Sequence, residues 1–223
     1  LREYGVYAHG THVAGIASAG SNHKIMGIKY IQTPLSSVLK LIKGDKSTEK
    51  DYHLYLYKVA EMLAGKLGAV VTFVGENKAD VANGSFGAPF SSARSIATAV
   101  YREIFKKEPD ETEIFKGSYI FQTFMNRVYA KSFEATPNTL YVFAAGNEGR
   151  NNDIFPFSPA GADAANSITV AACSGSVDIA KFSNYGVKSV DVAAPGVNIS
   201  SAAPGTTRVA MSGTSQAAPF VSN

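Results

Sequence analysis

The sequence contains little of what marks several classes of protein. Its 223 residues include a single cysteine, Cys173, which leaves no pair for a disulfide framework and no thiolate cluster for a metal. The apolar run before it makes Cys173 a small core residue rather than a reactive thiol. No stretch is long and apolar enough to span a bilayer. The net charge is only +3, without a block of lysine or arginine, so no nucleic-acid partner is indicated.

What is present is the composition of one large globular domain. Hydrophobic residues make up 45% and charged residues 17%, which is enough for a sizeable core. We therefore expect a single domain over residues 1–223. The sequence begins at Leu1 without an initiator methionine or a signal peptide, and it ends at Asn223, soon after a predicted helix starts. These ends predict a fragment, truncated on both sides.

The motif GTSQAAP near the C-terminus places Ser215 where a helix begins. Gly213 permits a sharp turn, Ala217 and Ala218 favour a helix, and we expect Pro219 in its first turn, where a missing N–H costs little. Free N–H groups at a helix N-terminus stabilise negative charge, as a nucleophile that creates an oxyanion requires. A serine that merely caps a helix explains the same residues.

Two histidines three positions apart occur in HGTHVAGIAS. His9 and His12 would share one face of a helix. One interpretation is a pair of metal ligands, but there is no HExxH pattern and no nearby His, Cys or Asp cluster to complete the site. The other is a general base, since an imidazole with a pKa near ~6.5 suits catalysis at neutral pH.

HGTHVAGIAS, AAGNEG and GTSQAAP, in this order, resemble three signature blocks of the subtilisin-like serine proteases (subtilases, the peptidase S8 family). The resemblance extends over essentially the whole chain. It implies an α/β fold of three layers, α/β/α, with a mainly parallel central sheet. By position in the motifs, His9 corresponds to the general base, Ser215 to the nucleophile and Asn147 to the oxyanion-hole side chain. His12 corresponds to the second, non-catalytic histidine.

The aspartate of the family's catalytic triad has no counterpart here. Glu3 is the only acidic residue before His9, and no Asp-[Ser/Thr]-Gly pattern surrounds it. Asp191 follows His9 in the chain and corresponds to a structural position of the family. We therefore expect the N-terminal Asp block to lie upstream of this fragment. Loss of that aspartate lowers kcat by about 3 × 10⁴ in subtilisin, a figure taken from that enzyme, so the isolated fragment should be nearly inactive.

The resemblance also implies two walls of a substrate site. Ser85, Phe86 and Gly87 correspond to a strand that pairs with the substrate backbone, although an ordinary strand before a Gly-Pro turn explains them too. Ala144, Ala145 and Gly146 correspond to one wall of the specificity pocket.

By the same resemblance, Phe157 stands where many relatives place a small residue at the base of that pocket, and a large ring there would favour small or medium P1 side chains. The resemblance also implies a cis peptide bond between Ser158 and Pro159.

Hydrophobic periodicity predicts the remaining elements. Strands are expected at 37–42, 140–145 and 167–172, and a helix from residue 52 that ends at Gly65 to Gly68. Residues 91–137 form an enlarged helical region of two long helices joined by a charged connection. This region is either an exosite or partner platform, or a set of packing helices with a surface extension.

The function that follows is hydrolysis of peptide bonds by a serine endopeptidase. No cofactor is required, although Asn22 lies in a region where the family often carries a structural calcium. The expected partners are a polypeptide substrate and the protein's own pro-segment, and the resemblance implies secretion or a cell-envelope location. Two alternatives remain: a transpeptidase or macrocyclase on the same fold, and a non-catalytic binding protein that has kept it.

Overall fold

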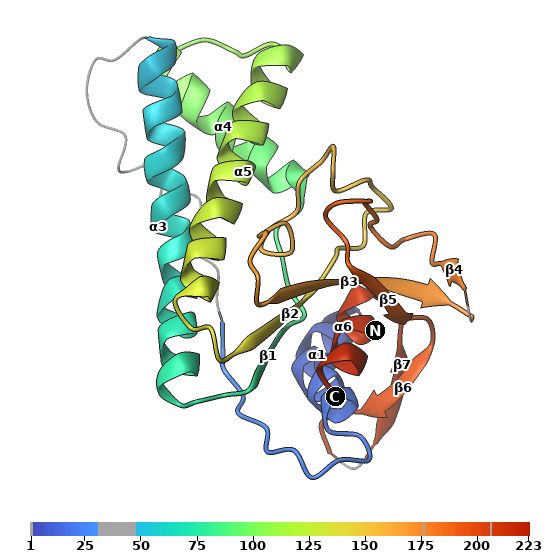
Figure 1. The fold of residues 1–223 in the computed structure, drawn as a ribbon. Coiled ribbons are helices and arrows are strands. Elements are labelled where there is room, and N and C mark those ends of the chain that lie inside the picture. Colours follow the sequence, from blue (N-terminus) through green and yellow to red (C-terminus); the bar gives the residue numbers. More distant parts are fainter. Residues whose placement is uncertain (1, 31–47, 176, 206) are drawn as a thin grey trace.

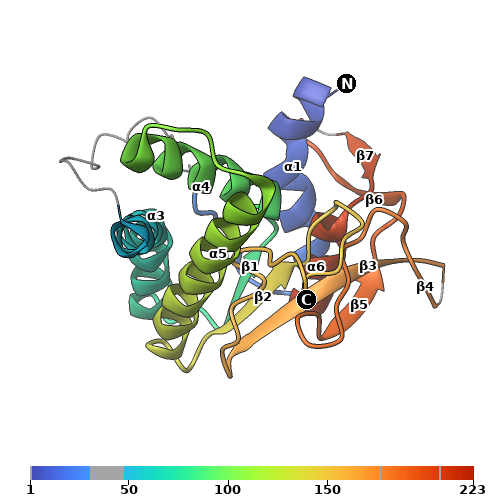
Figure 2. The same cartoon turned by 90° about the horizontal axis from the view of Figure 1, so that it is seen from above.

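The computed structural model describes residues 2–30, 48–175, 177–205 and 207–223, which form a mainly parallel β-sheet with helices on both faces (Figures 1 and 2). Strands β1 (Val81–Gly84), β2 (Leu140–Ala144), β3 (Ser167–Ser174) and β5 (Val192–Pro195) are parallel and adjacent in that order. The short strand β4 (Asp178–Ile179) pairs antiparallel with β3. The expected α/β fold with a mainly parallel central sheet is confirmed.

Successive side chains of β2 point to opposite faces of the sheet and contribute to two separate parts of the core. Tyr141 and Phe143 belong to a large cluster formed mostly by helices, whereas Val142 and Ala144 face a smaller cluster on the other side. All four side chains are buried. A strand that is apolar on both faces is typical of a parallel sheet covered on both sides, as the run at 140–145 predicted.

Three long helices lie together on one face: α3 (Glu49–Glu76), α4 (Phe90–Phe105) and α5 (Glu111–Glu134) (Figure 1). Helix α5 reaches the sheet through Phe133, whose ring centroid lies 4.6 Å from that of Tyr141 and 5.1 Å from that of Phe143. Helix α3 packs against α5 and α4. Among the described helices, none combines the length and apolar character that a membrane span requires.

The opposite face carries α6 (Thr214–Ser222), which packs on the sheet, and α1 (Arg2–Ala17), which packs on α6. Beside them lies an antiparallel hairpin of β6 (Ile199–Ala202) and β7 (Arg208–Met211) (Figure 2). Gly15 of α1 is close to this hairpin, because a Cβ there would lie 2.6 Å from Ser201 Oγ. The small side chains of α1 therefore permit close approach of the helix to β6.

The predicted end of the helix that begins near residue 52 is wrong. Helix α3 continues through Gly65 and Gly68 to Glu76, because Val71 and Val74 extend its buried stripe. A Cβ on Gly68 would lie 3.8 Å from Ser132 Oγ of α5, so this glycine lies at a helix–helix contact rather than at a helix end. The strand expected at 37–42 lies outside the described residues.

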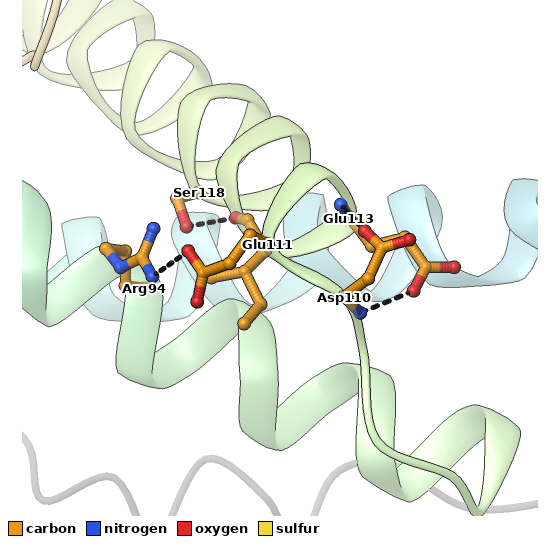
Figure 3. Close-up of polar contacts among 6 residues, drawn as sticks. Arg94, Asp110, Glu111, Glu113 and Ser118 are labelled. Atoms are coloured by element: carbon orange, nitrogen blue, oxygen red, sulfur yellow. Dashed lines mark hydrogen bonds and ion pairs between the residues drawn. The ribbon is translucent and has the colours of Figure 1, made fainter.

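The charged connection between α4 and α5 ends in the N-terminal cap of α5 (Figure 3). Asp110 caps α5 by accepting the N–H of Glu113 at 2.8 Å, while the Glu113 carboxylate accepts the N–H of Asp110 at 2.8 Å. Arg94 of α4 lies 2.7 Å from Glu111. A reciprocal capping box satisfies two backbone donors, so the sequence itself specifies where α5 begins.

Replacement of Phe133 by alanine should lower the free energy of unfolding by about 3–5 kcal/mol, because the fully buried ring joins α5 to β2. Phe115 on the same helix is 37% exposed, and Phe115→Ala should cost well under half as much. Urea unfolding of the two variants measures the difference. Equal losses would contradict this account of the core.

Candidate active site

Three segments that are distant in the sequence meet at the carboxyl edge of the sheet. Ser85 follows β1, Asn147 follows β2, and Ser215 begins α6. The hydroxyl of Ser85 donates to the Ser215 carbonyl at 2.8 Å, and the N–H of Gly146 donates to Thr214 Oγ1 at 3.1 Å. The carboxyl edge of a parallel sheet is where α/β folds place their functional sites.

Ser215 lies in the first turn of α6, as the GTSQAAP motif predicted. Its hydroxyl donates to the carbonyl of Ser85 at 3.2 Å. The helix N-terminus leaves backbone N–H groups without helical acceptors, and the helix dipole favours negative charge there. The position therefore suits a serine whose reaction develops an anion beside it.

Pro219 is not in the first turn, and that expectation is wrong. It is the sixth residue of α6 and lies inside the helix, where it cannot donate to the carbonyl of Ser215 four residues earlier. The Ser85 hydroxyl donates to that carbonyl instead, at 2.8 Å. This hydrogen bond replaces the missing helical one and joins the segment after β1 to the first turn of α6.

The side chain of Asn147 is held by Thr214, the residue before Ser215. Asn147 Oδ1 accepts the backbone N–H of Thr214 at 2.8 Å and its hydroxyl at 3.0 Å. A backbone N–H can only donate, so the atom that faces it must be the carboxamide oxygen. The Asn147 amide N–H groups have no acceptor among the described residues, so they are free to donate to a ligand.

His9 lies on α1 and is half-buried. The Asn223 side chain bonds the carbonyls of Ile16 and Ala19, which joins the C-terminal ends of α6 and α1. No hydrogen bond joins the side chains of His9 and Ser215 in the part of the chain described.

Burial lowers the pKa of His9 below its ordinary value, and the nearby charge of His12 lowers it further. Both effects disfavour the imidazolium, because desolvation and a like charge each penalise the charged form. The ring is therefore neutral at pH 7, which is the form that can accept a proton.

His12 is fully buried and bonds the hairpin. Its Nε2 lies 3.0 Å from the carbonyl oxygens of both Ile199 and Val209, and Ser201 Oγ donates to the His12 carbonyl at 2.8 Å. These contacts fix α1 on β6 and β7. They also argue against the interpretation of His9 and His12 as a metal pair, and no group of three His, Cys, Asp or Glu that could hold a metal exists within the described ranges.

Asp191, one of the two acidic residues considered for the triad, is not bonded to His9. Asp191 accepts the N–H of Thr169 at 2.7 Å, where β3 and β5 begin, at the edge of the sheet away from Asn147. The side chain of Glu3 lies outside the described residues. No carboxylate is bonded to His9 in the parts of the chain that the structure describes.

The two expected walls of the substrate site lie on either side of the Phe157 ring. A Cβ on Gly87 would lie 2.0 Å from Phe157 Cε1, and one on Gly146 would lie 2.7 Å from Phe157 Cε2. The ring therefore lies against both backbones and fills the space between them. Gly146 has φ +108°, which favours glycine. The peptide bond between Ser158 and Pro159 is cis, which confirms that prediction.

The backbones of the two walls differ in what they can still bind. Phe86 and Gly87 make no backbone hydrogen bond within the described ranges. Ala145 donates to the carbonyl of Val170 at 2.9 Å, and Gly146 donates to Thr214 Oγ1 at 3.1 Å and accepts from Asn184 N at 2.9 Å. Ala144 pairs with Val170 of β3, so this side has few free backbone groups, whereas the free groups of Phe86 and Gly87 can pair with an extended peptide.

The described residues around Asn22 do not form a set of oxygen ligands for calcium. Asn22 is exposed in a segment without regular structure, and His23 beside it is exposed as well. His53 lies far along the chain on α3, 4.0 Å from Glu49. A calcium site needs six to eight oxygen ligands, so the residues described do not fit the ion here.

Two residues with roles in this site were not singled out from the sequence. Thr214 belongs to the GTSQAAP motif, but its hydrogen bonds to Asn147 depend on the packing of α6 against the end of β2. Asn184, in the segment FSNYG, bonds the loop after β2. Neither sequence pattern indicates these hydrogen-bond partners.

Comparison with known proteins gives the same family. Residues 3–223 match the sequence model of the Subtilase family, Peptidase S8. Subtilisin BL of Lederbergia lenta is 28% identical over an alignment that covers 96% of this chain and 60% of the relative. Cerevisin of Saccharomyces cerevisiae is 51% identical over 83 residues, which cover 36% of this chain and 12% of the relative.

Two solved structures are similar over part of their length. A cold adapted subtilisin-like serine proteinase has a TM-score of 0.45 and 25% identity, covering 71% of this chain and 45% of that one. The self-cleaved protease domain of PatA has a TM-score of 0.47 and 24% identity, covering 71% and 48%.

The chain spans 42–60% of the length of the bacterial relatives that it matches almost from end to end. The family match covers all but its first two residues. The chain belongs to the subtilase family of serine peptidases.

Proposed function

We propose that the full-length protein that contains this chain is a serine endopeptidase, with Ser215 as nucleophile, His9 as general base and Asn147 in the oxyanion hole. The observation that carries the proposal is the orientation of Asn147, whose oxygen is bound by Thr214 while its N–H groups stay free. A capping serine alone would need no such neighbour. Membership of the subtilase family supports the same chemistry.

In the proposed reaction, Ser215 Oγ exchanges its hydrogen bond with the Ser85 carbonyl for one with the His9 ring. That bond is 3.2 Å long and joins neutral groups, so it is weak enough to be replaced when a substrate enters. His9 takes the hydroxyl proton as Ser215 attacks the scissile carbonyl. His9 then protonates the leaving amine, and water releases the acyl-enzyme.

The carbonyl oxygen of the substrate becomes an oxyanion during the attack. Asn147 Nδ2 and the backbone N–H of Ser215 would donate to it, and the N-terminus of α6 adds a favourable dipole. Removal of one such donor lowers kcat by about 10²–10³ in subtilisin, and that magnitude is taken from that enzyme. Because Thr214 already fixes the carboxamide, little reorganisation is needed as charge develops.

The proposal also includes a carboxylate for His9, a substrate and a location. The reaction needs a carboxylate to orient His9, and none is bonded to His9 among the described residues, so this chain alone should be nearly inactive. The substrate is a polypeptide, with the protein's own pro-segment as a second occupant of the site, and the protein would act in a secreted or cell-envelope location. A transpeptidase differs only in which nucleophile releases the acyl-enzyme.

Ser215 should react with a fluorophosphonate probe in the full-length protein, and peptide substrates should be hydrolysed rather than ligated. The variants Ser215→Ala and His9→Ala should each lose labelling and activity, by about 10⁶ in kcat if the cost in subtilisin applies. Mass spectrometry identifies the labelled residue and the products. Absence of labelling in the folded wild type would remove the protease proposal, and ligated products would favour the transpeptidase.

His9 should titrate below pH 6.5, because burial and the charge of His12 both disfavour its imidazolium. A base with a lowered folded-state pKa binds fewer protons than the unfolded chain just below 6.5, so stability should fall as pH decreases from 6.5 toward the folded-state value. NMR titration of this chain, with His9→Gln for assignment, measures the midpoint. A midpoint above 6.5 would contradict the described environment of the ring.

The Phe157 ring should restrict the P1 side chain, so the full-length protein should cleave after alanine better than after phenylalanine. Phe157→Ala should raise the ratio of kcat/KM for phenylalanine over alanine by about tenfold or more, as pocket discrimination of this size allows. The ratio is independent of the fraction of folded enzyme. Phe155→Ala, which removes a ring packed on Phe90, serves as the control and should leave the ratio unchanged. A wild-type preference for phenylalanine or tyrosine would refute the role of Phe157.

A further inference from the structure

We propose that Asn184 is the positioning residue of the oxyanion loop, the segment 145–150 that carries Asn147. The inference rests on the proposed function, since it concerns how the same site keeps its shape. Asn184 does not touch Asn147 or any reacting atom, so it would act only through the backbone and through Glu148.

The contacts of Asn184 concentrate on this loop. Its Oδ1 accepts the N–H of Glu148 at 2.9 Å and that of Arg150 at 3.1 Å. Its own N–H donates to the carbonyl of Gly146 at 2.9 Å. The residues immediately before and after Asn147 are therefore both hydrogen-bonded to Asn184.

The amide nitrogen of Asn184 completes the attachment. Nδ2 lies 3.1 Å from the carbonyl oxygen of Ala145, 2.8 Å from Glu148 Oε2 and 3.0 Å from Asn152 Oδ1. An asparagine amide has two protons, so three acceptors share them and no hydrogen-bonding capacity is left over. Asn184 is only 2% exposed, which makes these bonds costly to lose, because water cannot replace them.

The side chain and backbone of Asn147 are thus held by different elements. Thr214 of α6 holds the carboxamide, and Asn184 holds the peptide groups on either side. Gly146 packs directly against Asn184, because a Cβ on Gly146 would lie 2.4 Å from Asn184 Nδ2. A shift of the loop by a fraction of an ångström would carry the Asn147 N–H groups away from the position of the oxyanion.

The contact between Glu148 and Asn184 makes the inference testable by charge. Replacement of Asn184 by aspartate keeps the acceptor of the two loop N–H groups but places a carboxylate against Glu148, where Nδ2 now donates at 2.8 Å. Two carboxylates this close cannot both ionise without repulsion. The other charged or titratable groups in these segments are Arg150, Asp153, Lys181 and Tyr185, and none of their side chains bonds Asn184.

Asn166 provides a matched control at the other edge of the sheet. Its Nδ2 also donates to three carbonyls, those of Phe133, Thr136 and Thr139, and it holds the connection that enters β2. Asn166→Asp removes a comparable set of bonds without touching the loop after β2. It should destabilise the protein and leave kcat and the shape of the pH profile unchanged.

The experiment compares peptide hydrolysis by the full-length wild type, Asn184→Asp, Asn166→Asp and the double variant Asn184→Asp with Glu148→Gln, from pH 5 to 10. Asn184→Asp should lower kcat by about 10–100-fold with a smaller change in KM, as misplacement of a transition-state donor does. Its loss should grow with pH as the carboxylate pair ionises, and Glu148→Gln should restore most of the alkaline activity. A profile parallel to wild type, or equal losses in Asn184→Asp and Asn166→Asp, would overturn the inference.

Hydrogen exchange separates this inference from the protease proposal. If the folded wild type hydrolyses no peptide, the protease proposal fails, and the positioning role is decided by exchange alone. Asn184→Asp should then speed exchange of the amides of residues 146–150 at alkaline pH, relative to Asn166→Asp. Unchanged exchange in this segment would overturn the positioning role whatever the activity.

Discussion

The two hydrogen bonds from Thr214 to Asn147 Oδ1 are the interaction on which the site depends. They join the first turn of α6 to the loop after β2, and they determine which end of the carboxamide faces outward. Asn147 is exposed, and without these bonds its carboxamide would be free to rotate beside a serine at a helix start. With them, one free amide donor and one helix N-terminus lie around the same point at the carboxyl edge of the sheet.

Other contacts tie the remaining parts to this junction, and several compensate for a local break in regular structure. The proline inside α6 leaves the Ser215 carbonyl without a helical donor, and the Ser85 hydroxyl supplies one. His12 bonds the hairpin and keeps α1 in place, so the helix that carries His9 is fixed from its buried side. The arrangement therefore depends on side-chain hydrogen bonds between elements, not on the sheet alone.

Local motifs carried most of what could be predicted. The runs at 140–145 and 167–172 predicted buried strands, because a short apolar stretch bounded by polar turns is typical of a strand that is covered on both faces. Features set by distant contacts were missed or misplaced. The end of α3 depends on helix packing that overrides two glycines, and the hydrogen bonds of Asn184 join segments more than thirty residues apart. A single sequence gives no sign of such partners.

The central claim is that an imidazole, a hydroxyl and a carboxamide act on one carbonyl, and a crystal structure of the full-length protein phosphonylated at Ser215 tests it most directly. The account predicts a phosphonyl oxygen within about 3 Å of both Asn147 Nδ2 and the Ser215 backbone N–H, the length of a hydrogen bond. It also predicts that the His9 ring is in hydrogen-bond contact with the adduct. A phosphonyl oxygen directed away from Asn147, or a His9 ring out of reach of Ser215, would contradict it.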